Sequence, residues 1–403
     1  MLINADLHLH SRYSMACSER MELPTIAQEA KKKGIDLVAT GDCIHPQWLK
    51  AIKEAASDDE TIVIHNTHFI PTTEIEDRNR VHHLLILPSI SKAEELAEEM
   101  AKHGNIISDG RPTVRLDGCQ IAEIAKDVGA LIGPCHAFTP WTALYAAHDS
   151  LQSCYQDMTD HISFVELGLS ADTDYADRID ELHRLTFLSN SDAHSPWSNK
   201  LAREFTQFKV PQIDFNGLEK AILRQDGYGA TLNVGLFPQE GKYNRSACSR
   251  CHTQYTLEEC QSHNWRCPCG GQIKKGVFER VQELADHDTP RHPDHRPPYL
   301  HLMPLAEIIM MALGHASIST KGVKTAWETL VETFGSEVAV LLDAALDQLG
   351  PVDPRIVDAI AAFRNNDVII HPGGGGKYGW IELPQQDESP AEKTDNQSSL
   401  FDF

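Results

Sequence analysis

The stretch LTFLSNSDAH, residues 185–194, shows the pattern that decides the fold of this chain, because it is a short apolar run that ends in polar side chains. Short apolar runs rich in β-branched residues are typical of buried strands. The first 232 residues contain five more runs of this kind: IDLVATGD (35–42), TIVIHN (61–66), HHLLILP (82–88), ALIGPCH (130–136) and SFVELGL (163–169). The sequence therefore predicts a series of strands, most of them followed by polar residues.

Amphipathic segments separate these runs. LPTIAQEAKKKG (23–34) and KAEELAEEMAKHG (92–104) have helical periodicity and end in glycine, which favours the end of a helix. Strands that alternate with helices predict an α/β fold with βα units around a parallel sheet or barrel. In such folds the catalytic groups gather at the carboxyl ends of the strands. We therefore expect one shared site for Asp42, Glu74, His136 and Asp192.

The composition limits the class of protein. The chain has 403 residues, 41% hydrophobic and 23% charged, which are ordinary globular values for two or three domains. No apolar run reaches the roughly 18 residues that span a bilayer, and the first residues lack the features of a secretory signal, so we expect a cytoplasmic protein that acts with the nucleoid and has no membrane partner. The formal net charge of −22 argues against broad electrostatic capture of nucleic acid.

Two pairs of metal-binding residue types share one spacing. His8 and His10 are two residues apart, as are Asp192 and His194, so on an extended chain both members of a pair point to the same side. A single His-x-His occurs about once by chance in a chain this rich in histidine. The carboxylates at the other strand ends make a metal site more probable, because imidazoles mixed with carboxylates suit Zn, Mn or Fe and allow several ions.

The order of these motifs resembles that of the polymerase and histidinol phosphatase (PHP) family of metal-dependent phosphoesterases. The matching segments are DLHLHS (6–11), TGDCIH (40–45), TTEIE (72–76) with VHHLLI (81–86), GPCHAF (133–138) and SNSDAHS (189–195). The resemblance implies a distorted (β/α)7 barrel with two to three divalent ions, Zn, Mn or Mg, at the strand ends. It implies these metal ligands: His8, His10, Asp42, His45, Glu74, His83, His136, Asp192 and His194.

Within this set the resemblance gives the catalytic role to Asp192, His8, His10, Glu74 and His194. Only one of the adjacent His82 and His83 can face the site, and the run after His83 resembles the strand that follows the family's histidine. The family's second motif is Thr-Asp-His, whereas this chain separates the two ligand types, so Asp42 and His45 are expected to share that position.

Four cysteines form a second pattern. Cys248 and Cys251 are followed after fifteen residues by Cys267 and Cys269, which resembles the paired turns of a zinc ribbon and predicts one structural zinc. The second turn is one residue shorter than usual, so another residue can replace one of the four ligands: His252, Cys260 or His263.

A glycine run follows near the end of the chain. It fails the P-loop pattern, because a tyrosine stands where Ser or Thr should bind Mg²⁺. A glycine run lets the backbone approach a DNA phosphate or a displaced base, although a simple flexible loop is the alternative. The predicted DNA-binding residues are Gly373, Gly374, Gly375, Gly376, Lys377 and Tyr378.

The expected domains are a catalytic barrel (1–240), a zinc-binding module with a connector (241–300), a helical domain with the glycine loop (301–384) and a disordered tail (385–403). The tail ends in QSSLFDF, which matches a short sliding-clamp-binding motif. The predicted clamp contacts, with PCNA or its bacterial counterpart, are Gln397, Leu400, Phe401 and Phe403.

Residues 1–384 as a whole resemble the endonuclease Q family. That resemblance implies a DNA-repair endonuclease that uses a metal-activated hydroxide to cut on the 5′ side of uracil, hypoxanthine, xanthine or an abasic site. Two alternatives are a PHP phosphatase for a small phosphomonoester and a non-catalytic scaffold for DNA or a clamp. With a net charge of −22, the endonuclease should bind locally at the lesion and weakly to undamaged duplex.

Overall fold

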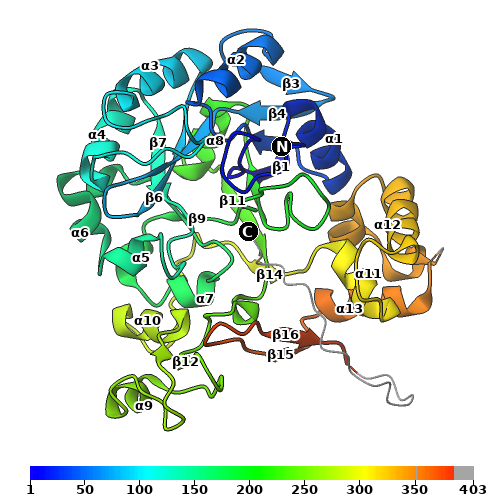
Figure 1. Ribbon diagram of the computed structural model, residues 1–403. Coiled ribbons are helices and arrows are strands. Elements are labelled where there is room, and N and C mark those ends of the chain that lie inside the picture. Colours follow the sequence, from blue (N-terminus) through cyan, green and yellow to red (C-terminus); the bar gives the residue numbers. More distant parts are fainter. Residues whose placement is uncertain (351, 385–403) are drawn as a thin grey trace.

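The computed structural model describes residues 1–350 and 352–384 and has a mixed α/β fold (Figure 1). The main sheet has the strand order β14-β11-β10-β1-β2-β4-β3. Its strands are β1 (Leu2–Asp6), β2 (Leu37–Ala39), β3 (Ile62–Ile64), β4 (Thr67–Ile70), β10 (Phe205–Lys209), β11 (Gly229–Gly235) and β14 (Tyr299–His301).

The expected parallel arrangement holds for only part of the chain. β1 pairs in parallel with β2 and β2 with β4, but β10 runs antiparallel to β1. A second sheet is wholly antiparallel and contains β5 (Thr72–Glu76), β6 (His82–Ile86) and β7 (Leu131–Pro134), while β8 (Phe164–Glu166) pairs in parallel with β9 (Thr186–Leu188). The apolar runs predicted six of these strands, β2, β3, β6, β7, β8 and β9, but the direction of pairing depends on connections that periodicity does not encode.

Helices cover the outside of these sheets. The first ends at Gly34, whose φ of 89° is left-handed, as the terminal glycine of the amphipathic segment predicted. The helices of this part are α1 (Leu23–Lys33), α2 (Pro46–Ala55), α3 (Ile90–Met100), α4 (Gly118–Asp127), α5 (Leu144–Ala147), α6 (Leu151–Tyr155), α7 (Thr173–Ala176) and α8 (Phe215–Ile222).

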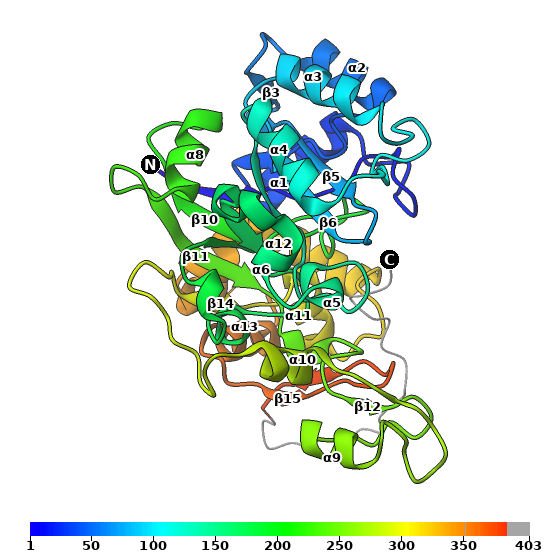
Figure 2. The ribbon, with the colours of Figure 1, turned by 90° about the vertical axis from the view of Figure 1, so that its left-hand side faces the viewer.

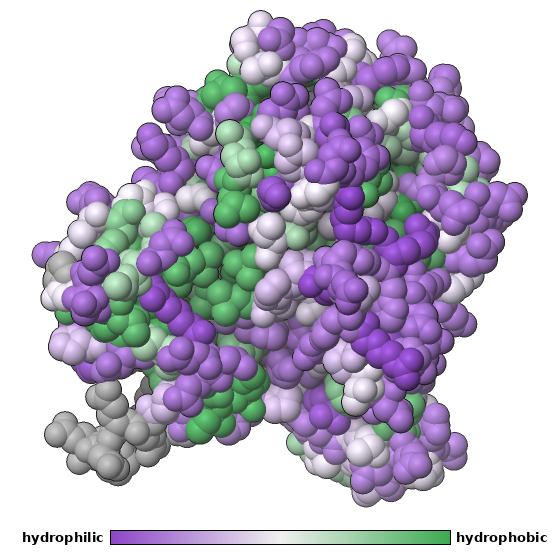
Figure 3. All heavy atoms as spheres, turned by 180° about the vertical axis from the view of Figure 1, so that it is seen from behind, coloured by the Kyte–Doolittle hydropathy of each residue, from purple (hydrophilic) through white to green (hydrophobic). Residues whose placement is uncertain are grey.

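We call the sheets and covering helices of residues 1–240 the barrel, after the expected domain. A group of helices lies beside them: α11 (Leu305–Leu313), α12 (Lys321–Phe334) and α13 (Pro354–Arg364). The apolar segment at 337–350, within the region expected to be helical, forms two short helical turns, Ala339–Asp343 and Leu346–Leu349, separated by Ala344 in an extended conformation (φ −64°, ψ 133°). Seen from behind, the surface is largely hydrophilic, and a hydrophobic area lies where these helices meet the barrel (Figure 3).

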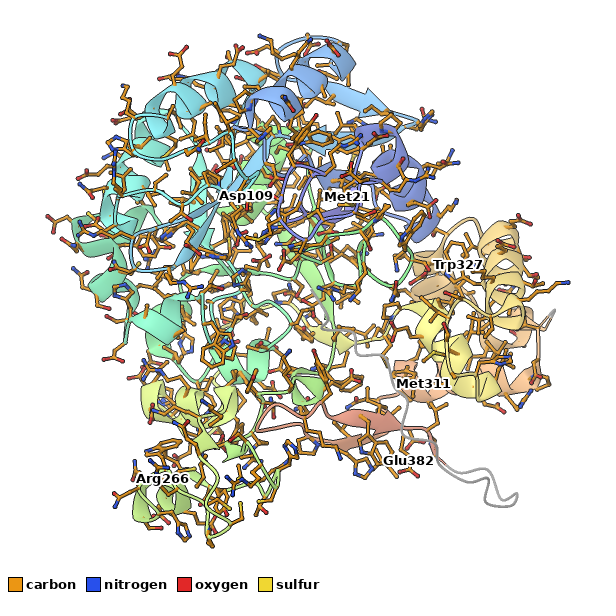
Figure 4. All side chains as sticks on the ribbon, viewed as in Figure 1. Met21, Asp109, Arg266, Met311, Trp327 and Glu382 are labelled. Atoms are coloured by element: carbon orange, nitrogen blue, oxygen red, sulfur yellow. The ribbon has the colours of Figure 1, made fainter. Side chains whose placement is uncertain are left out.

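The cysteine module lies at the end of the molecule opposite α2 and α3 (Figure 2). Its Arg266 is labelled in Figure 4. It contains α9 (Leu257–Ser262) and the pair β12 (Ala247–Cys248) and β13 (Ile273–Lys274), and α10 (Val277–Leu284) follows. The hairpin of β15 (Ile369–His371) and β16 (Trp380–Glu382) lies between the module and the C-terminal helices. No helix in the described ranges is long and apolar enough to cross a membrane.

Candidate active site

Two strand ends lie side by side and place the two spaced pairs together. β1 ends at Asp6, and the chain stays extended, so that Leu7 and Leu9 enter the core while His8 and His10 face the opposite side. The segment after β9 pairs with it in parallel: the Asp192 amide donates to the His8 carbonyl at 2.9 Å, and the His10 amide donates to the Ala193 carbonyl at 3.0 Å. The pairs His8/His10 and Asp192/His194 are therefore brought to one place.

Glu74, on β5, lies at the centre of the resulting cluster and is buried. Its Oε2 lies 3.1 Å from His10 Nε2, and its Oε1 lies 3.1 Å from His136 Nε2 and 2.6 Å from His82 Nδ1. Asp192 Oδ1 lies 3.2 Å from His10 Nε2. Four imidazoles, from His8, His10, His82 and His136, thus surround one carboxylate.

The adjacent histidines of β6 point to opposite faces, and the face that joins the cluster belongs to His82, not to the predicted His83. The register pairs Glu76 with His82, so His82 shares the face of Glu74, two residues away. The His83 imidazole lies on the other face, 2.8 Å from the Tyr155 hydroxyl. The expectation for His83 is corrected accordingly.

Two carboxylates hold the outer nitrogens of the first histidine pair. Glu166 lies 2.9 Å from His8 Nδ1, and Asp42 lies 2.9 Å from His10 Nδ1. Asp42 also accepts bonds from Ser11 and Ser14, which fix it in place. This arrangement, in which a carboxylate orients a histidine whose other nitrogen faces the centre, is typical of metal sites. Asp42 thus contacts the nitrogen of His10 that points away from the centre of the cluster.

His45 lies apart from the centre of the cluster. Its Nε2 is 3.0 Å from the Ile107 carbonyl, and its ring stacks on Tyr13 with centroids 4.5 Å apart. The second-motif position expected for Asp42 and His45 is therefore occupied by a supporting carboxylate and a packed imidazole. His194 does lie at the site, with its ring centroid 4.6 Å from that of His10.

Backbone strain also marks this site. Asp42, His136 and Asp192 have φ values of 46°, 27° and 46°, in the left-handed region that non-glycine residues rarely adopt. Such conformations cost about 1–3 kcal/mol each and persist where the surroundings fix them, most often at functional sites.

The donor set fits divalent cations. Ligand atoms of His8, His10 and Glu74, of His10, Asp192 and His194, and of Glu74, His82 and His136 each lie within 4.8 Å of one another. Four buried atoms that face the centre contact neighbouring polar groups of the cluster without forming a hydrogen bond of good geometry in the described chain, which is costly unless a ligand satisfies them: His8 Nε2, His10 Nε2, His82 Nδ1 and Asp192 Oδ1.

The charges of the cluster favour a cation as well. Burial alone lowers the pKa of His8, but Glu166 outweighs it, so the pKa lies well above its usual value. Burial raises the pKa of Glu74, but His82 and Arg111 outweigh it and hold the pKa well below its usual range. The carboxylates thus stay ionised and attract positive charge, which divalent ions supply by displacing protons from the imidazoles.

Sequence reasoning weighed His82 but chose His83, and it missed two residues here: Glu166 and Arg111. Glu166 is the last residue of β8 and lies inside an apolar run that the sequence did reveal (163–169), so a carboxylate at a strand end was the available signal. Arg111, whose Nη1 lies 3.4 Å from Glu74 Oε2, belongs to a loop without regular periodicity, and no sequence signal marked it.

The four predicted cysteines do come together. Cys248 and Cys269 sulfurs are 3.5 Å apart, as are those of Cys251 and Cys267, and all four lie within 4.8 Å of one another. Hydrogen bonds from Thr253 lower the pKa of Cys251 to about 6, which favours the thiolate that zinc requires. The group is complete without the alternatives His252, Cys260 and His263.

The glycine run packs against the cysteine module. A Cβ on Gly374 would lie 2.6 Å from the Arg245 carbonyl oxygen, and one on Gly375 would lie 2.5 Å from that of Cys248. Gly373, Gly374 and Gly375 are buried, whereas Gly376 and Lys377 are exposed. Close backbone packing therefore explains three of the four glycines. The clamp motif, Gln397 to Phe403, lies outside the described residues.

Comparison with known proteins covers nearly the whole chain. Residues 304–367 match the family description "MJ0043 C-terminal domain". A Methanocaldococcus jannaschii protein, MJ0043, is 47% identical over 257 residues, which are 62% of this chain but only 32% of that protein. Bacillus subtilis YqxK is 30% identical over 404 residues, covering 94% of this chain and 99% of that protein.

Two solved structures are similar over their full length. The lesion-specific endonuclease PfuEndoQ from Pyrococcus furiosus has a TM-score of 0.92 and 48% identity, with 96% of each chain covered. A complex of endonuclease Q with a 27-mer duplex carrying an abasic lesion at its active site has a TM-score of 0.89 and 48% identity, covering 96% of this chain and 97% of that one. The chain therefore belongs to the endonuclease Q family.

Proposed function

We propose that this protein is a metal-dependent DNA-repair endonuclease that hydrolyses the phosphodiester on the 5′ side of uracil, hypoxanthine, xanthine or an abasic site. One observation carries the proposal: a buried cluster of imidazoles and carboxylates lies in a chain that is 48% identical, over 96% of its length, to a lesion-specific endonuclease.

The cluster would hold two to three divalent ions, Zn, Mn or Mg, through the residues that face its centre: His8, His10, Glu74, His82, His136, Asp192 and His194. Such ions lower the pKa of water and stabilise the charge of an in-line phosphoryl displacement. Glu166 and Asp42 fix the tautomers and ring positions of His8 and His10, so that Nε2 of each faces the centre.

Cationic side chains lie next to the cluster, where a phosphate would enter. A cavity of about 280 Å³ borders Asp192 and His194 and is also lined by Lys200 and Arg203. The guanidinium of Arg111 is also close to the cluster, with its Nη1 3.4 Å from Glu74 Oε2. These charges give the site a local attraction for a phosphodiester in a protein whose formal net charge is −22.

The DNA is expected to extend from the cluster toward the cysteine module. The loop after His136 carries Trp141, which is 58% exposed and meets the Tyr243 ring edge-on at 5.5 Å. Lys242 lies 5.2 Å from the centre of the Tyr378 ring, at the exposed end of the glycine loop. An exposed tryptophan beside two half-buried tyrosines, with Lys242 between those tyrosines, is suited to stacking bases and binding the backbone.

A labelled duplex with one uracil, hypoxanthine or abasic site, incubated with Mn²⁺ or Mg²⁺, tests the function. We expect one break on the 5′ side of the lesion, none in an undamaged duplex, and none with Asp192→Asn. If the protein cuts beside none of these lesions, the proposal is refuted. Release of phosphate from small phosphomonoesters alone would favour a phosphatase.

The last seven residues extend the proposal to a partner. We propose that Gln397, Leu400, Phe401 and Phe403 bind a sliding clamp, which would deliver an enzyme with little affinity for undamaged DNA. Surface plasmon resonance with PCNA and with the bacterial clamp should show binding that Leu400→Ala with Phe403→Ala abolishes, while cleavage of a short duplex is unchanged. Equal binding by the double variant would contradict the motif.

A further inference from the structure

A pocket of about 250 Å³ lies at the opposite end of the barrel from the metal cluster. It is formed where β10 ends and where β9 and β11 begin, and Thr186, Lys209, Arg224 and Tyr228 line it. Lys209 pairs with Leu2 at the start of β1, whereas the metal cluster begins after the other end of that strand. Figure 2 shows α8 and the amino-terminus close together on this side. The pocket is thus separate from the active site.

The lining of this pocket is basic. Lys209, Arg224, His295 and Arg296 line it, and no acidic residue does. Such a lining is unusual in a chain with 58 acidic and 36 basic residues. Arg296 already has a structural role, because its guanidinium pairs with Asp177 at 2.9 Å and lies 3.2 Å from the centre of the Phe187 ring.

Arg224 is different, because its bonds leave its charge uncompensated. Its Nη1 donates to the Thr186 hydroxyl at 2.6 Å, and its Nη2 donates to the Arg184 carbonyl at 2.7 Å. Both acceptors are neutral, and no carboxylate of the described chain forms an ion pair with Arg224. The guanidinium is therefore fixed in position and retains donors for an anion.

The backbone at Arg224 supports a specific need for this side chain. The residue follows the C-cap of α8, Leu223, and has a φ of 55°. Glycine is the usual residue at this position, because it alone adopts the left-handed conformation without strain. An arginine here keeps the strain and gains the two bonds that aim the guanidinium along the pocket wall.

We infer that this pocket binds the phosphomonoester group of a small molecule, such as a nucleoside monophosphate. Arg224 supplies a planar fork for two phosphate oxygens, and Lys209 adds a second positive charge. The Tyr228 ring lies on the wall where the rest of the ligand would extend. The volume of about 250 Å³ is just below the roughly 300–1,000 Å³ of typical ligand pockets, and so suits a compact ligand.

Calorimetric titration of the full-length protein with AMP and with inorganic phosphate tests this inference. Arg224→Gly removes the guanidinium and relieves the backbone strain, so it should fold; we expect at least a tenfold loss of affinity for one bound AMP, and a several-fold loss with Lys209→Gln. The matched control is Lys220→Gln, which replaces a half-buried lysine that pairs with Asp226 at 2.9 Å; this variant should bind AMP as the wild type does.

AMP bound at the catalytic ions would be retained by Arg224→Gly, as would cleavage of lesion-containing DNA, so the two sites are distinguished. Three results would overturn the inference. The first is an unchanged number and affinity of bound AMP molecules in Arg224→Gly, and the second is an equal loss of affinity for AMP in Lys220→Gln. The third is that AMP does not bind at all while duplex DNA displaces phosphate from this pocket.

Discussion

His82 Nδ1 lies 2.6 Å from Glu74 Oε1, and this contact identifies which of two adjacent histidines belongs to the active site. The next residue, His83, is turned to the opposite face of the same strand and meets the Tyr155 hydroxyl. Both imidazoles are buried, so burial alone does not distinguish them.

Replacing each histidine in turn should separate these roles. We expect His82→Ala to lower the bound divalent metal and to reduce cleavage by more than the roughly 10–100-fold that loss of a ligand-orienting group costs, because a ligand atom itself is removed from the cluster. His83→Ala should instead lower the melting temperature, because it leaves a cavity beside Tyr155. Metal analysis and thermal melting of both variants measure the difference; normal metal content in His82→Ala would exclude it as a ligand.

Glu166→Gln should weaken metal binding, although Glu166 contacts only the nitrogen of His8 that points away from the centre of the cluster. The amide carries no charge and no longer fixes the tautomer of His8, so we expect about 10–100-fold lower metal affinity. Competition with a chelator, monitored by metal release, measures this affinity. Glu240→Gln is the matched control, since that buried carboxyl belongs to no metal-ligand group described here, and an equal loss of metal affinity in both variants would mean that Glu166 does not act through its contact with His8.

Cys251→Ser and Cys269→Ser should each release one zinc ion, because a four-thiolate site loses most of its affinity with one ligand. The barrel has its own core and should keep its fold, so we expect the catalytic ions to remain bound. Zinc analysis with circular dichroism follows both effects. A protein that retains a full complement of zinc after either change would rule out the four-cysteine site.

Stability should fall as the pH rises from 5 to 8, in part because of Glu240. Burial raises its pKa to about 8 from the usual 4.5 of a glutamate, so in this window the folded protein retains a proton that the unfolded chain has lost. Bound protons then favour folding, and raising the pH removes that contribution. Glu240→Gln should flatten the profile, with a gain of up to a few kcal/mol near pH 8. Urea denaturation at several pH values would test this, and an unchanged slope would contradict it.

Gly375→Ala should destabilise the contact between the glycine loop and the cysteine module. Its φ of 63° and a Cβ only 2.5 Å from the Cys248 carbonyl oxygen both oppose a side chain. Gly129→Ala is the matched control, because Gly129 has a φ of 75° with no atom within 4 Å of the added Cβ. We expect about 1 kcal/mol for the control and about 1–3 kcal/mol more at Gly375, measured by chemical denaturation. Equal costs would indicate that the loop moves away easily.

The sequence was sufficient for much of the fold and of the site because both depend on local patterns. Apolar runs predicted strands such as β2 and β9, and Asp192, just after β9, was expected in one site with His8 and His10 and lies with them. Strand direction was not predictable in this way, and neither was the choice of His82, because that choice depends on the register between β5 and β6. Arg111 was not predictable either, because it lies on a loop whose path depends on tertiary packing.

β14 returns to the main sheet directly beside β11, with Asn233 paired with Tyr299 and Gly235 with His301. The chain therefore leaves the sheet after β11, forms the cysteine module, and re-enters at the neighbouring position. The segment between β11 and β14 has the geometry of an insertion between two adjacent strands. Its length and content can vary while the strands that flank it stay in register. Relatives in which this insertion differs would then share one catalytic scaffold and differ in how they bind their substrate.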